Sequence, residues 1–275
     1  MAGHPMHIPL HILSDPSFGF LTTMRCAVTM TQVCNIPLLE EHLDRLESVW
    51  ASYENAMQGS SSFRMRLKSQ IQDFVKEQSP ADYRLRAVLS TGGQLDLQAV
   101  PLPASSPPFA THPDQLGLAR YDVLLNPESC TSGKTYEDLY RIKTTRREIY
   151  ELPLQQTKDL ARQAGIAIPF DTIMHWQQPG STARENDLVS ETSFANIAVH
   201  VPLGDGSPEW LTPEESDTVP FLSGVMRRHL LERGVLRTGR ITVRDFERWV
   251  AEGRRVIGMN GLKGVWEANV LSLQM

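Results

Sequence analysis

The sequence predicts a mixed α/β (α+β) protein with two domains, and three observations lead to this prediction. Hydrophobic residues make up 41% of the 275 residues and charged residues 21%, as in folded globular chains. Segments with helical periodicity alternate with segments of strand periodicity. The length fits one large domain or two ordinary ones, and the dense prolines of residues 100–113 favour a linker between two. We therefore expect an N-terminal α/β domain over 1–105, a linker over 106–116 and a C-terminal domain over 117–275.

The N-terminal domain is expected to combine two helices with a small sheet. Residues 18–25 are rich in strand-forming side chains and threonine, which predicts a strand. Leucines at helical spacing after Pro37 predict an amphipathic helix, and residues 63–78 predict a second helix that Pro80 ends. Alternating apolar residues over 83–89, a Gly-Gly turn and a second alternating run predict a β-hairpin.

Strands and helices are also expected to alternate in the C-terminal half. Residues 121–125 and 171–174 predict strands, and a helix beyond Lys143 is expected to break or restart at Pro153. Residues 185–201 predict a turn that passes into one alternating strand. The remaining expectations are a helix that opens after Gly224, a helix that starts within 241–246, and a strand within 255–264 that leads to a glycine-rich turn.

Charge and cysteine content exclude several classes of protein. A net charge of -5 argues against a protein that neutralises nucleic-acid phosphates. Cys26, Cys34 and Cys130 lack CxxC spacing, so we expect inert thiols and neither a disulfide framework nor a bound metal. No apolar run approaches the roughly 20 residues of a membrane-spanning helix, and histidines interrupt the first residues, unlike a secretory signal. We expect a soluble, cytoplasmic protein that binds neither nucleic acid nor membrane.

Two positions have features of a ligand site but also have ordinary structural explanations. Arg45 lies beside the leucine stripe of its predicted helix, so it either extends from the edge of a core or points into a pocket. Gly224 precedes a predicted helix, whose first backbone N–H groups are a common anion site. The alternative at Gly224 is an ordinary helix start.

Five short motifs occur in consistent order and together resemble the class IV aminotransferases, the fold-type IV group of pyridoxal phosphate enzymes. The motifs are His42-Leu43-Asp44-Arg45-Leu46, Lys143-Thr144-Thr145-Arg146-Arg147, Glu191 to Asn196, Leu222-Ser223-Gly224-Val225-Met226-Arg227 and Asn260-Gly261-Leu262-Lys263-Gly264. Each motif is weak alone, whereas five in order are a strong signal. Within the group, the chain is most similar to 4-amino-4-deoxychorismate lyases. The resemblance implies a smaller N-terminal domain followed by a larger C-terminal pseudo-barrel domain.

The resemblance also implies pyridoxal 5'-phosphate as the cofactor and gives roles to particular residues. Lys143 would form a Schiff base with it and later act as the base at the substrate carbon. Glu191 would keep the pyridine nitrogen protonated, because a carboxylate and a ring cation favour each other's charged forms. Asn196, counted with the cofactor residues, would brace the strand that carries Glu191.

The phosphate of the cofactor would be held by the Arg45 guanidinium and by the backbone of Gly224, Val225 and Met226. Many aminotransferases of this group have threonine where Met226 stands, and its hydroxyl would add a contact that is absent here. Methionine also occurs at this position in lyase-like members, so Met226 favours the lyase.

The implied reaction releases pyruvate and 4-aminobenzoate, a folate precursor, from aminodeoxychorismate, with no second keto acid. One alternative is a class IV aminotransferase that acts on branched-chain amino acids, D-amino acids or amines. Another is a catalytically silent homologue that binds the cofactor, since residues 1–17 lack the family's usual opening strand and glycine turn. Family members are homodimers, so a homodimer is expected.

The groups that would contact the substrate carry the weakest signal. The candidates are Thr22, Thr23, Arg25, Arg86 and Asn260. Arg86 lies on the polar side of the predicted hairpin, where it would meet a substrate carboxylate only if that side lines a cleft. For Asn260 a structural role is the competing expectation.

Overall fold

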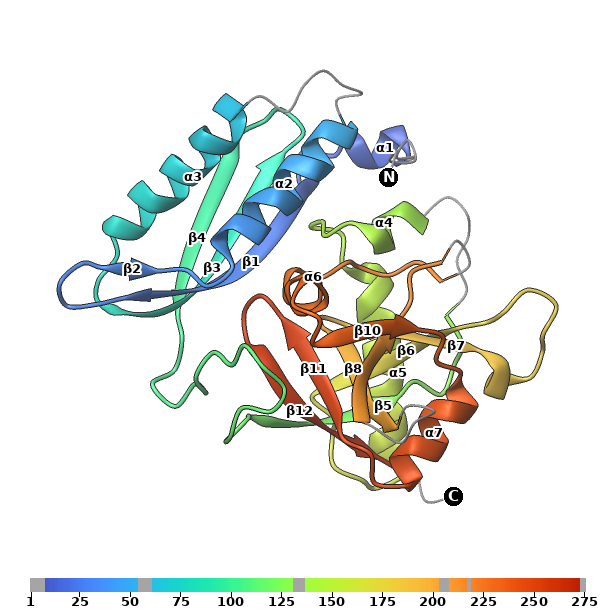
Figure 1. The fold of residues 1–275 in the computed structure, drawn as a ribbon. Coiled ribbons are helices and arrows are strands. Elements are labelled where there is room, and N and C mark those ends of the chain that lie inside the picture. Colours follow the sequence, from blue (N-terminus) through green and yellow to red (C-terminus); the bar gives the residue numbers. More distant parts are fainter. Residues whose placement is uncertain (1–7, 54–60, 131–136, 203–207, 217–218, 273–275) are drawn as a thin grey trace. The chain divides into compact units, whose positions relative to one another are not determined.

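A computed structural model describes residues 8–53, 61–130, 137–202, 208–216 and 219–272 of the chain (Figure 1). The chain divides into two compact units. The first comprises Met1–Phe109 and Lys134–Arg146, and the second comprises Ala110–Gly133 and Arg147–Met275. The boundary between Phe109 and Ala110 lies within the range predicted for the linker. One part differs from the prediction, because the segment with Lys143 groups with the first unit instead of the C-terminal domain.

The first unit contains a four-stranded antiparallel sheet with two helices on one face (Figure 1). Its strands, in the order β2-β1-β3-β4, are β1 (Gly19–Val28), β2 (Cys34–Asn35), β3 (Ala81–Ser90) and β4 (Leu95–Pro101). Its helices are α1 (Leu10–Leu13), α2 (Leu39–Tyr53), α3 (Ser61–Lys76) and α4 (Glu137–Arg141). Leu43 and Leu67, from the predicted apolar stripes of α2 and α3, are fully buried. The predicted strand, helices and hairpin are confirmed.

The segment after α4 lies along the first half of β1, which explains why it belongs to the first unit. The Leu21 N–H donates to the Lys143 carbonyl at 2.7 Å, and the Thr145 N–H donates to the Gly19 carbonyl at 2.9 Å. Between them, Thr144 and Phe20 form an antiparallel bridge. These bonds fix the backbone from the Lys143 carbonyl to Thr145.

The second unit is built on strands that close into a ring. Its strands are β5 (Arg120–Leu125), β6 (Asp171–Trp176), β7 (Leu188–Thr192), β8 (Asn196–Pro202), β9 (Pro208–Pro213), β10 (Leu236–Gly239), β11 (Val256–Asn260) and β12 (Gly264–Leu271). Pairing of β7 with β8 closes the ring β8-β11-β12-β5-β6-β7, and β9 and β10 extend the sheet beyond β8. The expected pseudo-barrel is therefore confirmed.

The helices described in this unit are α5 (Glu148–Gln163), the 3-10 helix η2 (Arg184–Asn186), α6 (Val225–Glu232) and α7 (Val243–Ala251). The break predicted at Pro153 is wrong, because α5 continues through it. Proline removes one backbone donor, but the buried side chains of Tyr150, Thr157 and Ala161 anchor the helix on both sides of it. The Thr157 hydroxyl also donates to the Pro153 carbonyl at 2.9 Å.

The turn predicted at the start of 185–201 is present as η2, but the single strand predicted after it is wrong, because the chain forms the hairpin of β7 and β8 there. The Thr192 N–H donates to the Ala195 carbonyl at 2.7 Å, and the Ala195 N–H donates to the Thr192 hydroxyl at 2.9 Å. As a result, Glu191 and Asn196 are register partners on neighbouring strands instead of lying five positions apart along one strand.

The core of the second unit combines buried side chains of the ring with one face of α7. Val123, Ile173, Ile197 and Trp266 from four strands of the ring belong to the same buried cluster as Phe246 of α7. Among the helices in the described ranges, none has the length and apolar content needed to span a membrane.

Candidate functional site

Glu191 is a buried carboxylate in the middle of a hydrogen-bond network in the second unit. Its side chain lies on β7 and the residue is only 2% exposed. Oε1 accepts the Leu222 N–H at 3.1 Å and the Tyr150 hydroxyl at 3.2 Å, while Oε2 lies 3.5 Å from the Asn196 amide nitrogen. These three donors are neutral groups, and they hold the buried carboxylate in a defined position.

Asn196 joins Glu191 to the loop before α6. Its amide nitrogen donates to the Leu222 carbonyl at 2.8 Å, and its amide oxygen accepts the Gly224 N–H at 3.1 Å. Both ends of the amide are therefore bonded to the same short loop. The carboxylate and the start of the helix are held in one fixed arrangement within the second unit.

The start of α6 has the features of an anion site. Gly224 is its N-cap in an extended conformation, no side chain caps it in the described residues, and its first turn contains no acidic residue. The N–H groups of Val225 and Met226 therefore stand at the positive end of a helix that has no carboxylate of its own there. This arrangement suits a phosphate.

Glycine at position 224 is required by the close approach of Asn196. A Cβ atom there would lie 2.0 Å from the Asn196 amide oxygen, far inside contact distance. We expect Gly224→Ala to lower the free energy of unfolding by about 1–3 kcal/mol, because it forces apart groups that hydrogen bonds hold together. Urea unfolding measures this change.

Gly92→Ala is the matched control for that substitution. A Cβ atom at Gly92 would meet only the Ser90 hydroxyl oxygen, at 3.8 Å. The free energy of unfolding of Gly92→Ala should therefore stay within about 0.5 kcal/mol of that of the unmodified protein. Equal free energies of unfolding for the two variants would contradict a steric clash at Gly224.

Arg227, the last residue of the motif around Gly224, has a structural role. It is 2% exposed, and its guanidinium donates to the Pro213 carbonyl at 2.7 Å and to Glu215 Oε1 at 3.1 Å. Its cation also lies 5.0 Å from the centre of the Phe221 ring. Burial lowers the pKa of Arg227, and Glu215 opposes this shift. Arg227 thus ties α6 to the segment that follows β9.

Asp171, which the sequence marked only as the start of a strand, supports the turn of the β7–β8 hairpin. It is fully buried, and its Oδ1 accepts the Ser193 hydroxyl at 2.5 Å and the Ser193 N–H at 3.1 Å. Loss of solvation raises the pKa of Asp171 to about 6, against the lowering effect of hydrogen bonds from Ser193 and Thr192. The turn next to Glu191 is therefore held by Asp171, whose pKa lies above its usual range.

This shift predicts a pH dependence of stability. Because the pKa of Asp171 is about 6 in the folded chain against 3.8 for the free residue, the folded state binds the proton more tightly. The protein should therefore gain stability from this group as the pH falls from 6 towards 4, by at most about 3 kcal/mol. Asp171→Asn removes the titration. Urea unfolding near pH 7 and near pH 4 gives the difference in free energy of unfolding between the unmodified protein and Asp171→Asn. This difference should change with pH, and a constant difference would contradict the raised pKa of Asp171.

Lys143 and Arg45 lie in the first unit. Lys143 is half-buried, and just beyond it Arg146 forms an ion pair with Asp15. Hydrogen bonds from Ser17 lower the pKa of Asp15, and Arg146 adds to the effect. Arg45 is half-buried on α2, beside the buried leucine stripe as the sequence predicted.

The predicted substrate residues of the first unit lie on β1 and β3. The Thr22 hydroxyl is buried and lies 2.6 Å from His42 Nδ1. Arg25 forms an ion pair with Asp82 and also donates to the Pro107 carbonyl at 2.5 Å. Thr23 and Arg86 are half-buried register partners. Thr22 and Arg25 thus have partners within the protein, and their role toward a substrate stays a prediction.

Asn260, the remaining substrate candidate, shapes the turn between β11 and β12 in the second unit. Its side-chain oxygen accepts the N–H groups of Leu262 at 3.0 Å and Lys263 at 2.8 Å. Its amide nitrogen donates to the Phe194 carbonyl at 3.3 Å. These bonds match the structural alternative, and a role toward a substrate stays a prediction.

Comparison with known proteins identifies the fold. No protein-family model matches the chain, and no curated protein matches it. Among solved structures, a Mesorhizobium loti protein assigned as an amino-acid aminotransferase matches with 20% identity and a TM-score of 0.61, over 92% of this chain and 100% of that one. A Haemophilus somnus protein assigned as a 4-amino-4-deoxychorismate lyase matches with 15% identity and a TM-score of 0.55, over 89% and 97%. A hypothetical aminotransferase from Mycobacterium tuberculosis, in its PLP-bound form, matches with 17% identity and a TM-score of 0.59, over 100% and 88%.

The chain has the fold IV architecture of these proteins. At identities of 15–20% the likeness establishes the fold alone. Within this fold IV chain, the second unit brings together Glu191, Asn196 and residues 224–226, and their role toward a cofactor stays a prediction. Tyr150 joins the same group through its bond to Glu191, and no motif in the sequence selects it.

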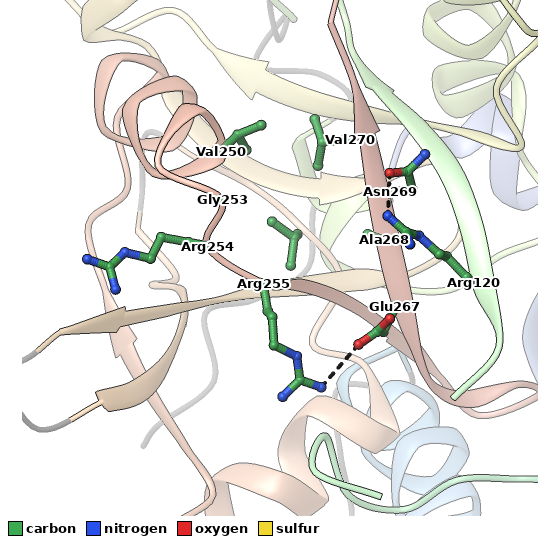
Figure 2. Close-up of a pocket in the computed structure, with 10 residues that line it drawn as sticks. Arg120, Val250, Gly253, Arg254, Arg255, Glu267, Ala268, Asn269 and Val270 are labelled. Atoms are coloured by element: carbon green, nitrogen blue, oxygen red, sulfur yellow. Dashed lines mark hydrogen bonds and ion pairs between the residues drawn. The ribbon is translucent and has the colours of Figure 1, made fainter. Parts of the chain in front are cut away.

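A separate hollow of about 250 Å³ lies in the second unit, away from these residues (Figure 2). Arg120 and Arg255 flank it, and Val250 and Val270 contribute apolar surface. Arg120 donates to the Asn269 side-chain oxygen at 2.8 Å, and Arg255 forms an ion pair with Glu267 at 3.2 Å. No residue predicted for the cofactor or substrate lines this hollow.

Proposed function

We propose that this chain is a pyridoxal phosphate-dependent 4-amino-4-deoxychorismate lyase, which releases pyruvate and 4-aminobenzoate. The observation that supports it most is the link from buried Glu191, through Asn196, to the uncapped start of α6. Pyridoxal phosphate has a basic ring nitrogen at one side and an anionic phosphate at another. A carboxylate and a set of helix N–H groups in one rigid network fit both of these groups.

When bound, pyridoxal phosphate supplies an electron-accepting ring that stabilises negative charge at a substrate carbon. Lys143 would hold the cofactor covalently and, once released by the substrate amine, would move the proton at that carbon. Glu191 would keep the proton on the ring nitrogen, and Asn196 would hold the carboxylate in place. The neutral donors around Glu191 favour its ionised form, which this role requires.

The phosphate would be bound by Arg45 and by the backbone at the start of α6. Met226 is fully buried, so the chain offers the phosphate no hydroxyl at this position and only backbone N–H groups. This composition is the feature of the site that favours a lyase, because the threonine of many aminotransferases is missing. The similarity in fold to the protein assigned as an aminodeoxychorismate lyase also supports the choice.

A class IV aminotransferase is the second candidate, because a protein assigned as an amino-acid aminotransferase shares the fold with 20% identity. Two assays separate the candidates. Aminodeoxychorismate alone should yield pyruvate and 4-aminobenzoate, whereas an aminotransferase should turn over only when an amino donor and 2-oxoglutarate are both present. Keto-acid-dependent turnover without 4-aminobenzoate would overturn the lyase. A protein that binds the cofactor but is inactive in both assays would be the catalytically silent homologue.

The homodimer, the cytoplasmic location and the place in folate synthesis remain predictions. Light scattering on the purified protein measures the oligomeric state directly.

A further inference from the structure

We propose that Tyr150 is a positioning residue for Glu191, which fixes the orientation of the carboxylate and keeps it ionised toward the ring nitrogen of the cofactor. The inference rests on the proposed cofactor and holds for a lyase and an aminotransferase alike. It begins from the bond between the Tyr150 hydroxyl and Glu191 Oε1 at 3.2 Å. An ionised carboxylate only accepts hydrogen bonds, so the phenol is the donor.

Two of the donors to Glu191 meet at the same oxygen. Oε1 accepts from both Tyr150 and the Leu222 N–H, at 3.2 and 3.1 Å, whereas the Asn196 amide lies 3.5 Å from Oε2. Two donors on one oxygen fix the rotation of the carboxylate, because turning it would break both bonds. Since Leu222 contributes a backbone group, Tyr150 is the one of these two donors that a side-chain substitution can remove.

Tyr150 is itself held in place from two sides. It is the third residue of α5, where its N–H donates to the Arg147 carbonyl at 2.9 Å. The Arg147 guanidinium lies 5.3 Å from the centre of the Tyr150 ring and donates to the Ser193 carbonyl at 2.7 Å. Ser193 is in the turn that follows Glu191. One arginine therefore connects the start of α5 to the hairpin that carries the carboxylate, and a cation over the ring suits this geometry.

Removal of the Tyr150 hydroxyl should affect the binding and protonation of the cofactor more than the stability of the fold. Tyr150→Phe keeps the ring against Arg147 and deletes only the donor to Glu191. A hydrogen bond to a charged group contributes enough that its loss should weaken pyridoxal phosphate binding about tenfold. With one donor fewer, the carboxylate competes better for the proton of the ring nitrogen.

The experiment compares purified Tyr150→Phe with Tyr83→Phe. Tyr83 is a buried tyrosine of the first unit whose hydroxyl donates to the Ser79 carbonyl at 2.7 Å, so it matches the deleted bond without touching Glu191. The measurements are pyridoxal phosphate affinity and the ¹⁵N chemical shift of labelled cofactor, which reports the proton on the ring nitrogen. We expect Tyr150→Phe to lose about tenfold in affinity and to shift the nitrogen signal toward the unprotonated value. Tyr83→Phe should change neither quantity.

A second comparison excludes a general disturbance of the fold. In a Glu191→Gln protein the charged acceptor is already absent, so adding Tyr150→Phe should leave the nitrogen signal where Glu191→Gln alone puts it. An unchanged signal in Tyr150→Phe, or an equal shift in Tyr83→Phe, would overturn the role of Tyr150. If the unmodified protein binds no pyridoxal phosphate, the proposed function fails. If it binds the cofactor but Tyr150→Phe leaves both the affinity and the nitrogen signal unchanged, only the role of Tyr150 fails.

Discussion

Lys143→Ala is expected to abolish the absorbance band near the visible edge that pyridoxal phosphate forms with a lysine, and to lower turnover by about 10⁴-fold or more. The substitution removes both the covalent attachment and the base. Because this segment is held to β1 through backbone groups, the Lys143 carbonyl and the Thr145 N–H, the fold should survive the substitution. An absorbance spectrum of the purified protein and an assay of 4-aminobenzoate formation measure the two effects.

Lys68→Ala is the matched control, since Lys68 is a half-buried lysine of the first unit, like Lys143, and pairs with Glu40. It should keep both the band and the activity. A colourless unmodified protein that cannot be reconstituted with pyridoxal phosphate would contradict the cofactor, and a band that persists in Lys143→Ala would contradict the assignment of the lysine.

Glu191→Gln should lower turnover by about 10²-fold or more, because a neutral amide cannot keep a ring nitrogen protonated. Glu191→Ala should in addition destabilise the fold. It leaves the buried Tyr150 hydroxyl and Leu222 N–H without their acceptor, at a cost of about 1–3 kcal/mol for each group. Steady-state kinetics and urea unfolding of both variants separate the chemical effect from the structural one.

The control for this pair is Glu267→Gln, which removes a carboxylate that binds Arg255 far from β7 in the sequence and at the hollow shown in Figure 2. Its turnover should match that of the unmodified protein. Normal turnover by Glu191→Gln would contradict the role of Glu191 toward the ring nitrogen.

Elements with local signals could be predicted from the sequence. The leucine stripe of α2 and the alternating strands of β3 and β4 carry their own periodicity, and the structure places both as expected. The turn between β7 and β8 could not be predicted, because residues 193–195 contain neither glycine nor proline. That turn is held by Asp171, a buried side chain from β6 that is 22 positions away from Ser193. The periodicity of neighbouring residues does not indicate such a contact.

The candidate site divides in the same way. Glu191, Asn196 and Gly224 are positions of short motifs, and the structure connects them by hydrogen bonds within the second unit. Tyr150 belongs to no motif, and nothing about its spacing from Glu191 indicates contact. The two meet because α5 packs beside β6 and β7 lies next to β6, an arrangement that only the tertiary fold determines.

The pairing of residues 143–145 with β1 has a consequence for how the chain can fold. β2 pairs only with Ala27 and Val28 at the far end of β1, so it leaves the edge at Gly19–Leu21 to the later segment. The Gly19 N–H and its partner, the Thr145 hydroxyl, are separated by 126 positions. During synthesis this strand edge must therefore wait for half of the chain, and a fragment that ends at Phe109 would present it to other molecules. Open strand edges recruit further strands, so the segment that carries Lys143 also covers, in the completed chain, an edge that would otherwise be open to aggregation.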